Sequence, residues 1–205
     1  MALAVLRSRA LAGLAAPEVT VEVHLAAGLP SFTLVGLPDT EVKEARDRVR
    51  AAIVNSQLTF PLGRITVNLA PADLRKEGPG FDLPIALAML AASDQLDPRR
   101  LEEFVVVGEL ALDGSLRSVR GALPVAWRLR QGRRRRLIVP AANATEAALV
   151  GGVEVYPVAR LREAVDFLNG VTPIHPYRVD TQALFARSGD QYAVDLSDVR
   201  GQAHA

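Results

Sequence analysis

Apolar residues recur at two different spacings along the first 170 residues, and these spacings separate strands from helices. Val19, Val21 and Val23 alternate with polar residues, which predicts a strand buried on one face. Further β-branched or apolar runs predict strands at residues 3–6, 32–35, 64–69, 104–107, 137–139 and 153–156. Apolar positions at helical spacing predict helices at residues 40–53, 82–92, 122–130 and 161–168. This mixture of strands and helices favours an α+β fold with a mixed sheet.

Turn signals predict how two pairs of strands are connected. A glycine–proline turn at residues 28–30 predicts that strand 32–35 forms a hairpin with the strand before it. Asp113 and Gly114 predict a second hairpin. Glu109 lies in the apolar strand before that turn, so its carboxylate would need a partner such as Arg117 or Arg120 across the hairpin.

For several polar residues and one tryptophan, the neighbouring sequence indicates a structural role. Asp82 and Asn143 stand where N-terminal helix caps are expected. The charged face of helix 40–53 is expected to be solvated, as is Lys76 in a polar loop. Trp127 is expected in the core.

Composition excludes several classes of site. The 205 residues contain no cysteine, which excludes disulfides, thiolate zinc sites and cysteine nucleophiles. The three histidines are far apart in sequence, so no metal site is predicted. The formal net charge of +1 gives no overall attraction to nucleic acid. No apolar run reaches the roughly 20 residues of a membrane span, and the N-terminus does not have the pattern of a signal peptide. A cytoplasmic protein with no membrane partner is expected.

Lysine usage bears on nucleotide binding. Lys43 and Lys76 are the only lysines, and neither belongs to the Gly-Lys-Ser/Thr sequence of a phosphate-binding loop. The chain therefore contains no complete ATP site of that type, and no cofactor is expected within it.

Long stretches of the sequence resemble one family. They include Phe32-Thr-Leu-Val-Gly-Leu-Pro38, Ile65-Thr-Val-Asn-Leu-Ala-Pro-Ala-Asp-Leu74 and Phe81-Asp-Leu-Pro-Ile-Ala-Leu87. These stretches are similar to the N-terminal domain of the ComM/YifB-type magnesium-chelatase-like AAA+ proteins. The resemblance implies the fold of the Lon proteolytic domain over residues 1–170, followed by a linker over residues 171–194.

The same resemblance implies a further module and its ligands. Residues 195–205 resemble the start of an AAA+ ATPase module, which assigns Val199 and Gly201 as partial nucleotide contacts. ATP and Mg²⁺ are then expected in the remainder of that module. Members of the family are expected to form homo-oligomeric rings, hexamers, and to act on DNA through branch migration in transformation and recombination.

The resemblance to Lon raises the question of proteolysis. Lon-type peptidases use a serine nucleophile with a lysine base. Gly80 stands where the serine would be, and Leu123 stands where the lysine would be. No catalytic residue is therefore assigned, and a peptidase is the disfavoured alternative.

An arginine run supplies the candidate DNA contact. Arg133, Arg134, Arg135 and Arg136 form the densest group of charges and lead directly into strand 137–139. Guanidinium groups pair well with phosphates, although a solvated turn explains the same run. Two more functions stay open, a stand-alone interaction module and a metal-chelatase accessory.

Overall fold

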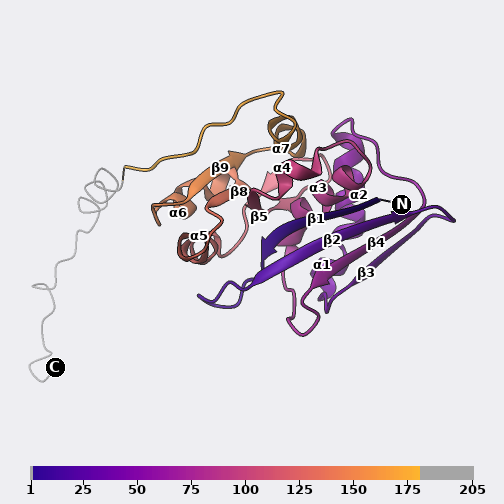
Figure 1. The fold of residues 1–205 in the computed structure, drawn as a ribbon, viewed down its shortest axis with the longest axis horizontal. Helices are drawn as coiled ribbons and strands as arrows, with labels where there is room; N and C mark the ends of the chain where they lie inside the picture. The colour runs from indigo at the N-terminus through magenta and orange to yellow at the C-terminus, as the bar shows by residue number, and fades with distance from the viewer. Residues whose placement is uncertain (1, 181–205) are drawn as a thin grey trace, which may run out of the picture.

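A seven-stranded mixed sheet is the centre of the molecule. The computed structural model describes residues 2–180. The strands are ordered β3-β4-β2-β1-β5-β8-β9 across the sheet (Figure 1). Their bounds are β1 Ala2–Arg9, β2 Glu18–Ala26, β3 Ser31–Val35, β4 Arg64–Ala70, β5 Phe104–Val106, β8 Arg136–Pro140 and β9 Glu154–Val158. The pairs β1–β2 and β2–β4 are antiparallel, whereas the remaining neighbours are parallel. The predicted mixed sheet is confirmed.

The pairing of β3 corrects the first predicted hairpin. β3 does not pair with β2 but lies parallel to β4, with Leu34 opposite Val67. Both edges of β2 are occupied, because β1 pairs with it along one side and β4 along the other. The chain after β2 therefore passes over β4, where the Ser31 amide donates to the Gly63 carbonyl at 3.1 Å.

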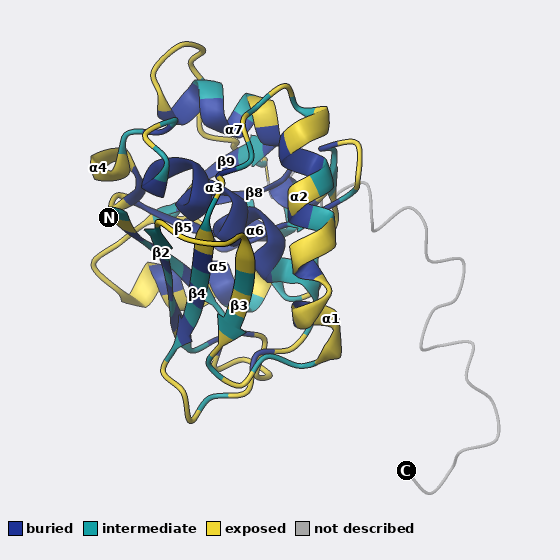
Figure 2. Ribbon diagram, turned by 90° about the vertical axis from the view of Figure 1, so that its right-hand side faces the viewer, coloured by how far each residue is buried: buried dark blue, intermediate teal, exposed yellow. Residues whose placement is uncertain are grey.

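The helices cover the two faces of the sheet unequally. Their bounds are α1 Thr40–Lys43, α2 Ala45–Asn55, α3 Asp82–Ala92, α4 Pro98–Leu101, α5 Ala122–Gln131, α6 Ala144–Ala148 and α7 Leu161–Leu168. All residues of α3 are buried, and the helix packs against β1 and β2 (Figure 2). On the other face, α5 and α6 cover only the half of the sheet that contains β5, β8 and β9.

The pattern of apolar residues in each strand reflects whether helices cover one face of the strand or both. Val106 and Ile138 point into the core shared with α3, whereas Val105, Leu137 and Val155 point into the smaller core beneath α5. A strand that is covered on both faces must be apolar at every position. β2 is covered on one face only, which explains its alternation of valine with polar residues.

The second hairpin forms beside the sheet. β6 Glu109–Leu110 and β7 Leu116–Arg117 pair antiparallel as a separate two-stranded unit. Arg117 lies 3.5 Å from Glu109 across this hairpin, which confirms that an arginine provides the partner.

Neither of the two predicted cap residues caps its helix with its side chain. Asp82 is not an N-cap but the first residue of α3, where its carboxylate is fully buried and ion-paired with Arg48. Asn143 stands at the predicted N-cap position of α6 and donates to Glu146 at 3.1 Å, yet its side chain makes no cap bond and instead bonds to both the amide and the carbonyl of Val119. In both cases a buried polar side chain satisfies a distant partner, and the sequence around it does not identify that partner.

The predicted helix 40–53 is divided in two. Asp39 caps α1 by accepting a 2.8 Å hydrogen bond from the Val42 amide, and α2 begins again after Glu44. The charged face of α2 is only partly solvated, because Arg48 turns toward Asp82.

The interpretation of Lys76 as a solvated lysine is also wrong. Its side chain is fully buried, and the ammonium group donates to the Pro71 carbonyl. The Lys76 main chain pairs with Leu37 and Asp39, which draws the residue inward. Burial lowers the pKa of Lys76, and Asp73 partly opposes this effect.

The chain after α7 follows the surface of the domain. Ile174 packs against the main core, and the Tyr177 amide donates to the Val155 carbonyl of β9 at 2.7 Å. The predicted boundary at residue 170 stays a prediction, and most of the predicted linker and all of residues 195–205 lie outside the described residues. Within residues 2–180, no helix has the length and apolar character needed to cross a membrane.

Candidate functional site

A cleft of about 660 Å³ opens between α1, the loop before α3 and the segment that connects β7 to α5. Arg9, the last residue of β1, also lines the cleft. The loop before α3 includes a short 3₁₀ turn, Pro79–Phe81. The lining residues are Arg9, Leu11, Asp39, Glu41, Glu44, Arg48, Glu77, Gly78, Pro79, Gly80, Phe81, Val107, Glu109, Ser118, Val119, Arg120 and Val125.

Asp39 fixes the shape of the cleft at its α1 side. One carboxylate oxygen caps α1, and the other accepts a 3.2 Å hydrogen bond from the Gly78 amide. Gly78 has a positive φ of 77°, a conformation that favours glycine. The loop and the helix are therefore joined by a single side chain.

An ion pair between Arg48 and Asp82 supports the base of the cleft. Arg48 Nε lies 2.7 Å from one oxygen of Asp82, and Arg48 Nη2 lies 3.0 Å from the other. The Leu110 amide adds a third hydrogen bond to Asp82 at 3.2 Å. Burial raises the pKa of Asp82, while the bonds from Arg48 act in the opposite direction. The hydrogen bond to Asp82 raises the pKa of the Arg48 guanidinium. The pair thus joins α2, α3 and β6.

Sequence reasoning missed this ion pair, although one signal pointed to it. A helix that is apolar on all sides must be buried along its whole length. Asp82 opens such a helix, so its carboxylate required a partner in the interior. The identity of that partner, a residue 34 positions earlier, depends on how α2 packs.

Side chains of both charges line the cleft. Glu41, Glu44, Glu77 and Glu109 are lining glutamates, and Arg9, Arg48 and Arg120 are lining arginines. Arg48 lies 3.5 Å from Glu44. Burial lowers the pKa of Arg9, Glu18 opposes this effect, and the nearby charge of Arg128 lowers the pKa further.

Gly80 and Leu123, the residues expected at the positions of a Lon-type catalytic pair, lie in different surroundings. Gly80 lines the cleft, and a side chain added there would approach Val119 at 3.8 Å, an ordinary contact. Leu123 is 39% exposed in the first turn of α5, where its amide donates to Glu146 at 3.0 Å.

Ser118 is the hydroxyl residue that lines the cleft, and a nucleophile would need a base beside it. Within residues 2–180 the Ser118 hydroxyl has no hydrogen-bond partner. Lys76 cannot act as that base, because its buried ammonium is directed to Pro71. The cleft therefore offers no activated nucleophile among the described residues.

The four arginines of the basic run do not behave alike. Arg136, the first residue of β8, lies beside Glu103 and 3.0 Å from Glu154. Arg134 donates to the Glu102 carbonyl at 3.1 Å. Arg133 and Arg135 are exposed, and their guanidinium groups have no partner within residues 2–180, whereas the Arg135 carbonyl accepts from the Glu154 amide at 2.7 Å. The run thus contributes two uncommitted guanidinium groups.

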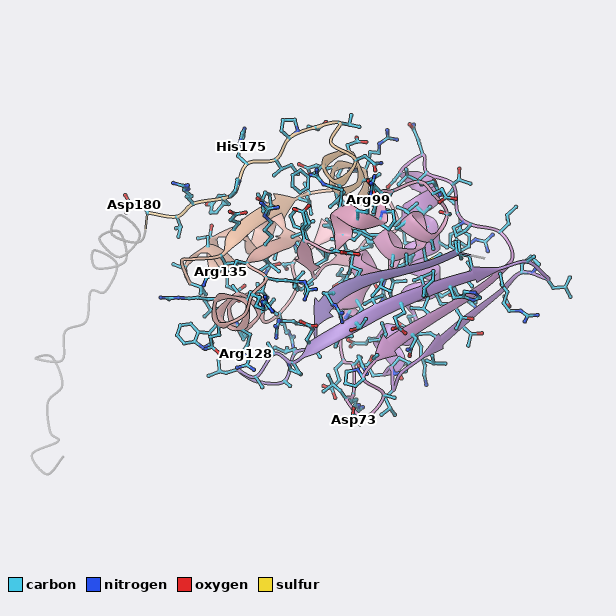
Figure 3. All side chains as sticks on the ribbon, viewed as in Figure 1. Asp73, Arg99, Arg128, Arg135, His175 and Asp180 are labelled. Atoms are coloured by element: carbon cyan, nitrogen blue, oxygen red, sulfur yellow. The ribbon has the colours of Figure 1, made fainter. Side chains whose placement is uncertain are left out.

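Helix α5 extends this basic surface. Arg128 and Arg135 lie at the same end of the molecule (Figure 3). Trp127 is 47% exposed on α5, so its assignment to the core is wrong, and Arg130 stacks near its ring at 5.9 Å. The core beneath α5 is filled by small and branched residues, which leaves the indole outside.

A family model described as subunit ChlI of Mg-chelatase matches residues 21–143. The chain belongs to this family. The predicted relationship to ComM and YifB is confirmed at the level of sequence similarity. The match covers β2 to the turn before α6, and so includes most of the cleft.

Two curated relatives match all or nearly all of this chain, and a third matches about half of it. Competence protein ComM of Haemophilus influenzae is 50% identical over 205 residues, which is all of this chain and 40% of ComM. YifB of Escherichia coli is 47% identical over 204 residues, covering 98% of this chain and 39% of YifB. DNA repair protein RadA of Aquifex aeolicus is 31% identical over 108 residues, covering 51% of this chain and 22% of RadA. The chain thus spans about two fifths of ComM and YifB.

Val199 and Gly201, the predicted nucleotide contacts, lie outside the described residues. Within residues 2–180, no group of three or more histidine, aspartate or glutamate side chains is arranged to hold a metal ion.

Proposed function

We propose that this chain is a non-proteolytic, Lon-like accessory domain of a larger ComM/YifB-type AAA+ ATPase that acts on DNA. The names of two relatives, a competence protein and a DNA repair protein, support a role in DNA metabolism. The cleft supports the loss of proteolysis, because Gly80 provides no nucleophile and Lys76 is directed elsewhere.

The proposal divides the work between this chain and the remainder of the parent protein. ATP and Mg²⁺ bind in the AAA+ module, whose opening includes Val199 and Gly201. The domain helps to organise a homo-oligomeric ring, a hexamer, and contacts DNA during branch migration. Its fold is that of the Lon proteolytic domain without the catalytic pair.

The observation that carries the DNA contact is the uncommitted charge beside α5. Arg133 and Arg135 are exposed and unpaired within residues 2–180, whereas Arg136 is neutralised by two glutamates. Unpaired guanidinium groups can replace the counterions of DNA phosphates. The exposed Trp127, next to Arg130 on α5, adds an aromatic surface.

The test replaces Arg133 and Arg135 together with alanine. Each phosphate contact contributes about 0.9 to the slope of log affinity against log salt concentration on duplex DNA. The double variant is therefore expected to flatten this slope by up to about 2 while binding stays independent of base sequence. Fluorescence anisotropy with a labelled duplex measures the slope, preferably in the assembled parent ring, where several weak contacts act together.

Two controls separate a local contact from other effects. Arg99 and Arg100 lie on α4, and Figure 3 shows Arg99 in a different part of the surface from Arg135. Replacing both α4 arginines with alanine removes the same charge. This variant is expected to keep the salt slope of the parent protein. Circular dichroism verifies that each variant is folded. Equal slopes for all three folded proteins would show that the arginine run makes no DNA contact.

A further inference from the structure

Trp127 places an aromatic ring on the surface of α5 that the packing of the domain does not use. The residue is 47% exposed and belongs to neither hydrophobic core. The Arg130 guanidinium lies over the ring, 5.9 Å from its centre, and is fixed by a 3.0 Å hydrogen bond to the Val150 carbonyl. Within residues 2–180, no other cation or aromatic ring stacks on the indole. The exposed part of the ring is therefore available to a planar ligand.

Positive charge lies in the same part of the surface. Arg128 follows Trp127 on α5, and within residues 2–180 its guanidinium bonds only to the uncharged side chain of Gln131, at 3.0 Å. Arg133 and Arg135 follow α5, and their guanidinium groups have no partner in that part of the chain. Arg128 and Arg135 lie at the same end of the molecule (Figure 3). A ligand that contacts the ring therefore also meets several guanidinium groups whose charge is not neutralised.

Carboxylates that contact α5 or β8 do not cancel this charge. Glu146 accepts a hydrogen bond from the Leu123 amide at 3.0 Å, in the first turn of α5. Glu103 and Glu154 both pair with Arg136, so they neutralise that arginine and leave its neighbours unpaired. Charge complementarity therefore favours an anionic partner for the surface around the indole.

A single nucleic acid strand satisfies both the ring and the charges. Its phosphates pair with guanidinium groups, and its unpaired bases stack on exposed aromatic side chains. In a duplex each base is already stacked between its neighbours, so a duplex uses the arginines and leaves the indole unused. An acidic protein segment would likewise satisfy the arginines alone. The ring thus distinguishes an unpaired strand from both.

We propose that the exposed face of α5 binds single-stranded DNA, with a base stacked on Trp127. The phosphates of the strand pair with Arg128, Arg133 and Arg135. This inference rests on the proposed DNA contact of the arginine run and adds to it a preference for unpaired strands. Arg130 holds the indole and is a positioning residue. Stacking releases no counterions, so the ring adds affinity for a single strand without changing how binding depends on salt.

The fluorescence of Trp127 provides a direct test, because it is the only tryptophan among the 205 residues. A short oligothymidylate is titrated into the chain at low salt, with excitation at a wavelength that tyrosine does not absorb. A stacked base is expected to quench the emission until the site is saturated. The matched ligand is an abasic oligonucleotide of equal length, which keeps the phosphates and lacks the bases. It is expected to bind through charge and to leave the emission largely unchanged.

Substitutions separate the ring from the charges. Trp127→Ala is expected to weaken binding of a labelled oligothymidylate by about fivefold, the lower end of the effect of losing one stacked base, because the ring is partly covered. Its salt slope and its affinity for duplex DNA are expected to stay unchanged. Leu123→Ala removes apolar surface four residues earlier, on the same face of α5, and is expected to bind normally. Alanine is favourable in helices, so both variants are expected to fold.

Three results would overturn the inference. The first is equal quenching, or none, with the oligothymidylate and the abasic strand. The second is an equal loss of affinity in Trp127→Ala and Leu123→Ala. The third is an equal loss of affinity for single-stranded and duplex DNA in Trp127→Ala. In each case a salt slope that flattens when Arg133 and Arg135 are replaced would still support the proposed DNA contact, so the two proposals can fail separately.

Discussion

Replacing Arg48 with methionine is expected to destabilise the protein strongly, because it leaves the Asp82 carboxylate buried without its cation. Asp82 is fully buried, and it would lose hydrogen bonds of 2.7 and 3.0 Å while keeping the bond from Leu110. Removing one member of a buried ion pair costs about 3–5 kcal/mol. The Arg48 side chain is 19% exposed, so water can partly replace it. We therefore expect the lower end, about 3 kcal/mol, or a fall in Tm of about 6–12 °C.

Urea unfolding followed by circular dichroism measures this loss. Arg46→Met is the matched control on the same helix, since Arg46 pairs with Asp47 at the surface, and it is expected to change stability by less than about 0.5 kcal/mol. Combining Arg48→Met with Asp82→Asn is expected to recover much of the loss, because no buried charge then remains.

The pH dependence provides a second check. Burial raises the pKa of Asp82, and loss of Arg48 removes the interaction that opposes this rise. A folded state with a raised carboxyl pKa takes up a proton more readily than the unfolded state, so acidification favours folding. The deficit of Arg48→Met is therefore expected to shrink as pH falls. A deficit below about 1 kcal/mol, unchanged by pH and by the second substitution, would refute the role assigned to the ion pair.

Three further outcomes follow from other residues. Lys76→Ala is expected to lower the free energy of unfolding by about 3 kcal/mol because it leaves a cavity. Lys76→Met is expected to lower it clearly less, because methionine fills the space without a buried charge, and urea midpoints compare the two variants. The Tyr156 hydroxyl lowers the pKa of Glu154, so the stability that this carboxylate provides is present above its unfolded pKa and is lost as pH falls through the lowered value. An acid titration of Glu154→Gln is expected to lack that component. The chain is expected to leave casein intact and to resist labelling at Ser118 by a fluorophosphonate, with mass spectrometry as the readout; labelling that Ser118→Ala removes would restore the peptidase hypothesis.

The sequence by itself determined most of the strands and helices, and it showed that this chain contains no Gly-Lys-Ser/Thr loop. Periodicity located the strands and long helices because burial on one or two faces leaves a direct record in residue spacing. The absence of a Gly-Lys-Ser/Thr loop and the glycine at position 80 required no structure. Family membership was likewise carried by long phrases of sequence, and the family match confirms it.

Tertiary structure decided which charged residues are free. Arg48 and Arg46 look equivalent on one helix, yet Arg48 reaches a buried carboxylate and Arg46 stays in solvent. Arg136 and Arg135 are neighbours, but β8 brings only Arg136 between two glutamates. Lys76 is buried by main-chain pairing with distant residues.

Packing between segments that are far apart in sequence also determines the strand order and the position of the cleft. β3 joins β4 because both edges of β2 are occupied, a competition between segments that local turn signals do not record. Glu41 and Arg120 are 79 positions apart and carry no common motif. They line one cleft because the sheet and α3 hold their segments there. The spacing of apolar residues shows which side of a helix or strand is buried. The partner of a given side chain in the folded protein depends on how all the helices and strands pack together.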